Sequence, residues 1–145
     1  IKDMHDKYAW METTLTVPTR HINGNATEIA IRAELPTNQQ WLIDEGRYMN
    51  NCIATYAKQV AKGSSIIVSI KKREETGGDN TDTDNTDNTE NTGNTEDTHT
   101  YARWIDLELD PEDFHIRQQY RSCNRKLDAE AKHIVDAWLK SVLSN

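Results

Sequence analysis

The sequence contains no run of apolar residues long enough to cross a lipid bilayer, which takes about eighteen or more. Its first ten residues, IKDMHDKYAW, also lack the apolar segment of a secretory signal peptide. The chain begins with Ile rather than Met, and we interpret it as the C-terminal part of a longer protein. We therefore expect a cytoplasmic domain with no membrane partner.

Cysteine is scarce as well, with two residues, Cys52 and Cys123, in different segments. Neither belongs to a C-x-x-C pair, and the five histidines show no spacing typical of a metal site. A domain of 145 residues can bury a sufficient core without a disulfide. We expect two reduced thiols, no metal and no cofactor.

Lysine and arginine are absent from residues 76–100, which hold seven of the 24 acids in the chain. Removing those seven leaves 17 acids against 17 bases, so the net charge of −7 belongs to this one stretch. The acidity of the whole chain therefore argues only weakly against binding to nucleic acid. A neutral remainder can still carry a basic face.

Aliphatic side chains are also absent from this Asn-Thr-Asp tract. It cannot offset the entropy cost of ordering by burying apolar surface. We predict that residues 76–100 are a low-complexity flexible insertion, a long disordered acidic loop between two strands. The Asp-x-Asp runs suggest a calcium site as an alternative, but the tract lacks the glycine and glutamate spacing of an EF-hand, so we favour the linker.

Alternation of apolar and polar residues predicts five strands. They are expected at 14–17, 27–35, 64–72, 101–109 and 114–121. Asn23-Gly24 is a strong turn signal, and it predicts a hairpin between the first two strands. In the strand YARWIDLEL, strict alternation predicts that Arg103 shares a face with Ile105.

Helical spacing predicts three helices, at 37–46, 47–62 and 127–143. We expect Thr37 to cap the first, Gly46 to end it, and Gly63 to end the second. Cys52 falls on the apolar stripe of the second helix. The order of elements predicts a single α+β domain, residues 1–145, with an antiparallel sheet built from hairpins and covered on one face by three helices.

Four short segments follow one another in an order that resembles a known family. They are Glu45 and Gly46 with Cys52, Ile53 and Tyr56; the strand IIVSIKK after Gly63; the strand WIDLEL; and Gln118, Arg121 and Asn124 before a helix with Trp138. Together, over residues 36–143, they resemble the PcfJ-like domain of proteins encoded on conjugative plasmids and other mobile elements. The resemblance implies a bacterial accessory domain and supplies no established reaction.

The chain departs from that family at two places. Asn50 and Asn51 stand where the family often has histidine, and Arg121 stands where it usually has glycine. The acidic tract also occupies the place of a short loop. If a histidine were the base for a cysteine nucleophile in the family, this chain lacks that histidine.

Cys52 and Glu45 are the candidate catalytic residues. A cysteine nucleophile needs a base and an orienting group, for which His115 or His133 and Glu45 or Asn124 are candidates. A position on an apolar helical stripe would instead bury the thiol and make it unreactive. We favour this structural interpretation of Cys52.

The polar residues of the family-like segments are the candidate binding residues. They are Glu45, Asn50, Asn51, Tyr56, Gln118 and Asn124, and we expect a polar pocket between the 45–56 helix and the 118–124 segment. Arg117, Arg121 and Arg125 lie around Tyr120 and are candidates for phosphate contacts, although a solvated loop is the commoner explanation.

We interpret the domain as a binding or regulatory module. The partners it suggests are proteins of a conjugation or phage system, with nucleic acid as a less favoured partner. The alternative is an enzyme that depends on a cysteine or a carboxylate and acts on a nucleic-acid or nucleotide-like substrate.

Overall fold

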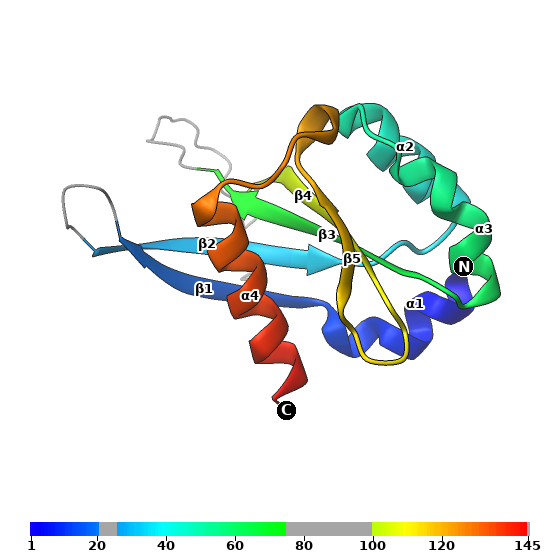
Figure 1. Cartoon of the computed structure of the whole chain (residues 1–145), viewed down its shortest axis with the longest axis horizontal. Coiled ribbons are helices and arrows are strands. Elements are labelled where there is room, and N and C mark those ends of the chain that lie inside the picture. The colour runs from blue at the N-terminus through cyan, green and yellow to red at the C-terminus, as the bar shows by residue number, and fades with distance from the viewer. Residues whose placement is uncertain (21–25, 75–99, 145) are drawn as a thin grey trace, which may run out of the picture.

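The computed structural model describes residues 1–20, 26–74 and 100–144. Its sheet has five strands in the order β1-β2-β3-β4-β5, and every neighbouring pair is antiparallel (Figure 1). The strands are β1 (Thr13–Arg20), β2 (Ala26–Glu34), β3 (Ile66–Arg73), β4 (Tyr101–Leu109) and β5 (Ile116–Tyr120). The predicted positions of all five strands are confirmed to within a few residues.

The helical elements connect and flank these strands. They are α1 (Lys2–Tyr8), η1 (Ala9–Met11), α2 (Gln39–Met49), η2 (Ile53–Tyr56), α3 (Ala57–Lys62), η4 (Ser122–Asn124) and α4 (Ala129–Leu143). Helix α4 buries the apolar stripe expected of it, including Ile134 and Trp138, and Asp128 caps its start by accepting from the backbone N–H of Ala131.

Both faces of the sheet are covered, because successive residues of a strand point to opposite sides. Val68 and Ile70 of β3 belong to the larger core, which also contains α4 and residues of α1 and η1. Ile67 immediately precedes Val68 and packs in a smaller core with Leu42 of α2 and Val60 of α3. Figure 1 shows α4 crossing in front of β1 and β2, away from α2 and α3.

The α+β class and the antiparallel sheet are therefore confirmed, whereas the arrangement of the helices needs correction. The described residues contain four α-helices rather than three, and these pack on both faces rather than one. The reason lies in β3, whose residues Ile66 to Ile70 are all buried. A strand that is buried on every residue needs a layer on each side.

Helix α2 begins and ends at places other than those predicted. Asn38, not Thr37, caps its start, accepting from the backbone N–H of Trp41 at 2.8 Å. Gly46 lies inside the helix rather than at its end. A Cβ at this position would approach Ala54 to 3.1 Å. This glycine permits the close contact between α2 and η2.

The predicted helix at 47–62 is interrupted. Asn50 ends α2 in the left-handed conformation, with φ of 52°, which asparagine adopts more readily than most residues. The chain then bends and resumes as η2 and α3, which ends at Gly63 with φ of 81°, as expected. Cys52 is therefore half-exposed at the start of η2, and its expected burial on a continuous helical stripe is wrong.

The predicted flexible insertion and its calcium alternative lie outside the described residues, except for Thr100. The described residues that flank 75–99 are close together, since the backbone N–H of Glu74 donates to the carbonyl of Thr100 at 2.8 Å. Among the described helices, none is long and apolar enough to cross a membrane.

Candidate functional site

A one-residue bulge in β4 positions two of the site's charged side chains. Ser69 pairs with Asp106 and Lys71 pairs with Arg103, so one extra residue of β4 lies opposite the step between Ile70 and Lys71. Strict alternation would place Arg103 and Asp106 on opposite faces. The bulge puts both on the face that α2 covers, so the predicted sharing of a face by Arg103 and Ile105 is wrong.

Glu45 projects from α2 into this arrangement and is almost fully buried, with 1% of its surface exposed. Its Oε1 accepts from Nε of Arg103 at 2.8 Å, and its Oε2 accepts from Oγ of Ser69 at 3.0 Å. A buried carboxylate is tolerated only when it is paired and hydrogen-bonded, and here both oxygens have partners. Glu45 therefore links α2 to both β3 and β4.

Asp106 is the second buried carboxyl group. Its Oδ2 accepts from Nδ2 of Asn51 at 2.8 Å, whereas its Oδ1 is buried and accepts no hydrogen bond from a described residue. Burial, a hydrogen bond with Glu45 and the charge of that carboxylate together raise the pKa of Asp106 to about 9, against the opposing effects of Asn51 and Arg103. Asp106 is therefore a neutral acid at pH 7.

The segment after β5 contains a second departure from ordinary backbone geometry. Cys123 and Asn124 are both left-handed, with φ of 62° and 58°. Each such residue costs about 1–2 kcal/mol relative to a right-handed conformation, somewhat less for asparagine. Asn50, at the end of α2, has the same left-handed geometry. Backbone strain of this kind is concentrated at functional sites.

Direct contacts join the 50–52 bend to the 122–124 segment, although the two are about seventy residues apart in sequence. Nδ2 of Asn50 donates to Sγ of Cys123 at 3.5 Å. The backbone N–H of Cys52 donates to Oδ1 of Asn124 at 3.3 Å. The structure thus brings together two of the predicted binding residues, Asn50 and Asn124, while Asn51 reaches from the same bend down to Asp106.

Of the remaining two predicted binding residues, Tyr56 lies beside Cys52, and Gln118 contacts Tyr120, which also lies near Cys52. Burial, followed by the nearby Cys52 thiol and Glu108, raises the pKa of Tyr56 to about 12. Burial and Cys52 also raise the pKa of Tyr120, whose hydroxyl donates to Oε1 of Gln118 at 2.8 Å. Both phenols are thus neutral hydrogen-bonding groups at physiological pH.

The two thiols differ in their surroundings. Cys123 is exposed, and hydrogen bonds from Asn50 and Ser122, with the charge of Arg125 nearby, lower its pKa below the usual range. A lower thiol pKa favours the reactive thiolate. The surroundings of Cys123 therefore favour its thiolate form.

Neither predicted histidine base contacts a cysteine. Nδ1 of His115 lies 2.7 Å from Asp113 in the β4–β5 turn, and Nε2 of His133 lies 3.0 Å from the carbonyl of Pro18. Glu45, the predicted orienting group, is held by Arg103 and Ser69 instead. The geometry does not assemble a cysteine–histidine pair from these residues.

The three predicted phosphate-binding arginines have different environments. Arg117 contacts Glu108 at 3.3 Å and Asp110 at 2.8 Å, and it also donates to Ser64 and Ser65, so its guanidinium is used within the fold. Arg121 has a long contact of 3.4 Å to Asp128. Arg125 is exposed near Cys123.

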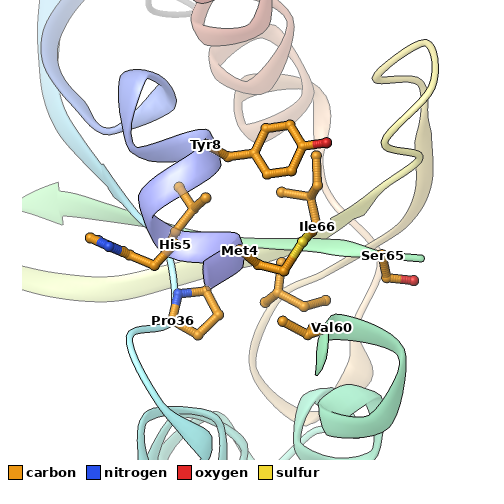
Figure 2. A pocket seen from close by; sticks show the side chains of 9 residues that line it. Met4, His5, Tyr8, Pro36, Val60, Ser65 and Ile66 are labelled. Atoms are coloured by element: carbon orange, nitrogen blue, oxygen red, sulfur yellow. The ribbon is translucent and has the colours of Figure 1, made fainter. Parts of the chain in front are cut away.

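Two further features lie away from the polar contacts. Asp110, Asp113 and His115 gather within 4.8 Å, but Asp110 is already paired with Arg117 and Asp113 with His115. A small pocket with about 190 Å³ of empty space lies between α1 and the start of β3, where Met4 packs near Ile66 and the ring of His5 turns away (Figure 2). Its lining is mostly apolar and it includes none of the predicted site residues.

Sequence reasoning missed Ser69, Arg103 and Asp106 as members of the site. A signal was present in the strand WIDLEL, where an acid interrupts a run of residues that are buried in the fold. The face that this acid occupies depends on the bulge, which alternation alone does not reveal.

The family model of the PcfJ-like proteins matches residues 2–91, and the chain belongs to this family. No curated protein and no solved structure matches the chain.

Proposed function

We propose that this chain is a binding or regulatory module of a mobile-element protein. We define its polar site as the six predicted binding residues together with Asp106: Glu45, Asn50, Asn51, Tyr56, Asp106, Gln118 and Asn124. The mobile-element role rests on the family. The binding role rests above all on Asp106, a buried neutral carboxyl group beside the 50–52 bend whose Oδ1 accepts no hydrogen bond from a described residue.

The energetic cost of this arrangement supports a role beyond stability. Burial of the Asp106 carboxyl group beside a second carboxyl group costs free energy, as the raised pKa of Asp106 reflects. Three left-handed non-glycine residues, Asn50, Cys123 and Asn124, add to that cost at the place where the two segments meet. Such costs are characteristic of sites that are preorganised for a ligand.

The side chains favour a neutral polar ligand. Asn50, Gln118 and Asn124 are exposed amides, and each offers both a donor and an acceptor. The charge of Glu45 is balanced by Arg103, and Asp106 is neutral. An amide-bearing loop of a partner protein has the chemistry that this set recognises best.

A thermal-shift assay with small amide probes tests the proposal. The probes are the N-acetyl amides of asparagine and glutamine, with acetamide for comparison. A probe with a Kd of about 1 mM stabilises the fold by about 1.4 kcal/mol at about 10 mM, which is a shift of a few degrees. Gln118→Ala and Asn124→Ala should abolish the shift, whereas Gln59→Ala, an exposed amide on α3, should leave it unchanged.

The absence of any shift from all three probes would contradict the proposal. A shift that survives both substitutions in the polar site would contradict it as well, because binding would then occur elsewhere.

The enzyme alternative is favoured by one observation, the exposed Cys123 with its lowered pKa. Alkylation by iodoacetamide at pH 7, followed by mass spectrometry, tests it. The alternative expects Cys123 to react faster than free cysteine and Asn50→Ala to slow that reaction, because Asn50 donates to the sulfur. A rate equal to that of free cysteine would remove the support for a nucleophile.

A further inference from the structure

A second surface of the molecule, which adjoins the polar site through the Arg103–Glu45 ion pair, is basic and open. A groove with about 820 Å³ of empty space lies where β3 ends and β4 begins. It is lined by Lys72, Arg73, Glu74, Ala102, Arg103, Trp104 and Arg121. Four of these seven residues are cations and one is an acid, although the chain as a whole carries a net charge of −7. We define these seven residues as the basic groove.

The cations of the basic groove are only lightly engaged within the fold. Arg73 is exposed and forms no ion pair with a described residue, and Lys72 lies over the ring of Trp104 with its Nζ 4.9 Å from the centroid. Of the nitrogens of Arg103, Nε alone donates to Glu45, and the terminal nitrogens have no acceptor among the described residues. Within the described part of the chain, the side chain of Arg121 has one contact, of 3.4 Å to Asp128.

Aromatic rings accompany these cations. Tyr48 is 65% exposed at the end of α2, and the guanidinium of Arg103 lies 4.5 Å from the centroid of its ring. A nucleobase can stack on an exposed tyrosine or on the plane of an arginine. Figure 1 shows the segment between β5 and α4, which carries Arg121, passing beside the start of β4.

From this combination we propose that the basic groove binds single-stranded nucleic acid. Its cations would hold successive phosphates, and Tyr48 with Arg103 would stack a base. The exposed aromatic ring favours nucleic acid over an acidic peptide, whose carboxylates need only the cations. It also favours a single strand over a duplex, whose bases are already stacked on one another. The proposal goes beyond the polar site and does not depend on it.

Fluorescence anisotropy with a labelled oligonucleotide of twenty thymidines and the full chain tests this proposal. Four phosphate contacts predict a slope of log K against log salt of about −3, and hence affinity that falls about 50-fold between 50 and 200 mM salt. Arg73→Gln should weaken binding about fivefold at 0.1 M salt and reduce the slope by about 0.7. Tyr48→Ala should weaken binding about tenfold and leave the slope unchanged.

Lys140→Gln is the matched control, because Lys140 is an exposed cation in the last turn of α4, outside the groove. It removes the same charge as Arg73→Gln and should change the affinity by less than twofold. Melting temperatures establish that each variant is folded.

Three results would overturn the proposal. They are the absence of binding at 50 mM salt, equal effects of Arg73→Gln and Lys140→Gln, and competition by a poly-glutamate peptide that matches competition by the unlabelled oligonucleotide. The second result would indicate attraction to the whole molecule, and the third would indicate an acidic-peptide site.

Discussion

The substitution Asp106→Asn tests the buried carboxyl network most sharply. In the folded protein the pKa of Asp106 is raised from 3.8 to about 9, mainly by burial. Between these two values the folded state holds a proton that the unfolded state has lost. The free energy of unfolding therefore falls as pH rises through this window, by about 1.4 kcal/mol per pH unit.

Asparagine is close in shape to a protonated aspartic acid and has no proton to lose. Its carbonyl can accept from Asn51 as Oδ2 of Asp106 does, and its amide can donate to Glu45 in place of the protonated carboxyl group. The variant should therefore gain stability relative to the parent chain as pH rises. Between pH 6 and pH 8 the difference should grow by about 3 kcal/mol.

Urea unfolding at pH 5, 6, 7 and 8, followed by circular dichroism, measures this difference. Asp136→Asn, an exposed acid on α4, is the matched control, and its effect should not change with pH over this range. If the difference between Asp106→Asn and the parent chain were also constant with pH, Asp106 would be ionised in the fold. The account of the network would then be wrong.

Two other perturbations test the backbone. Gly46→Ala should lower the free energy of unfolding by about 1–3 kcal/mol in urea titrations, because the new Cβ would meet Ala54 at 3.1 Å. An unchanged urea midpoint would show that α2 and η2 separate at little cost. Replacement of residues 77–98 by four Gly-Ser residues should leave the melting temperature nearly unchanged or slightly raised, because each halving of loop length gains about 0.6 kcal/mol and the backbones of Glu74 and Thr100 already meet. A loss of several degrees in calorimetry would contradict this.

Much of the fold follows from local patterns in the sequence. The strands of the first hairpin alternate around a turn signal, and the stripe of α4 has helical spacing, so both could be predicted with useful accuracy. The break at Asn50 could not, because asparagine is also common in ordinary helical and loop conformations. In the fold the left-handed turn at Asn50 accompanies the close packing of η2 against Gly46, a contact that local sequence patterns do not mark.

The candidate site could be predicted only in part. The segments around Asn50 and Asn124 are both predicted to carry binding residues, and the fold places them in contact. The family model matches the first of these segments and ends before the second. The network of Glu45 with Arg103 and Asp106 could not be foreseen, because it depends on a bulge of one residue. A shift of one residue changes the face of every side chain beyond it, and a hydrophobic pattern does not mark its position.

The central claim is that the 50–52 bend and the 122–124 segment form one ligand-binding site. The most direct test follows the side-chain amide resonances of Asn50, Gln118 and Asn124 by NMR while the N-acetyl amide of asparagine is added. The account predicts that these resonances and the backbone of the two segments shift most, with one common Kd, and that Asp106→Asn alters that Kd. Shifts confined to other parts of the chain, or none at saturating probe, would contradict it.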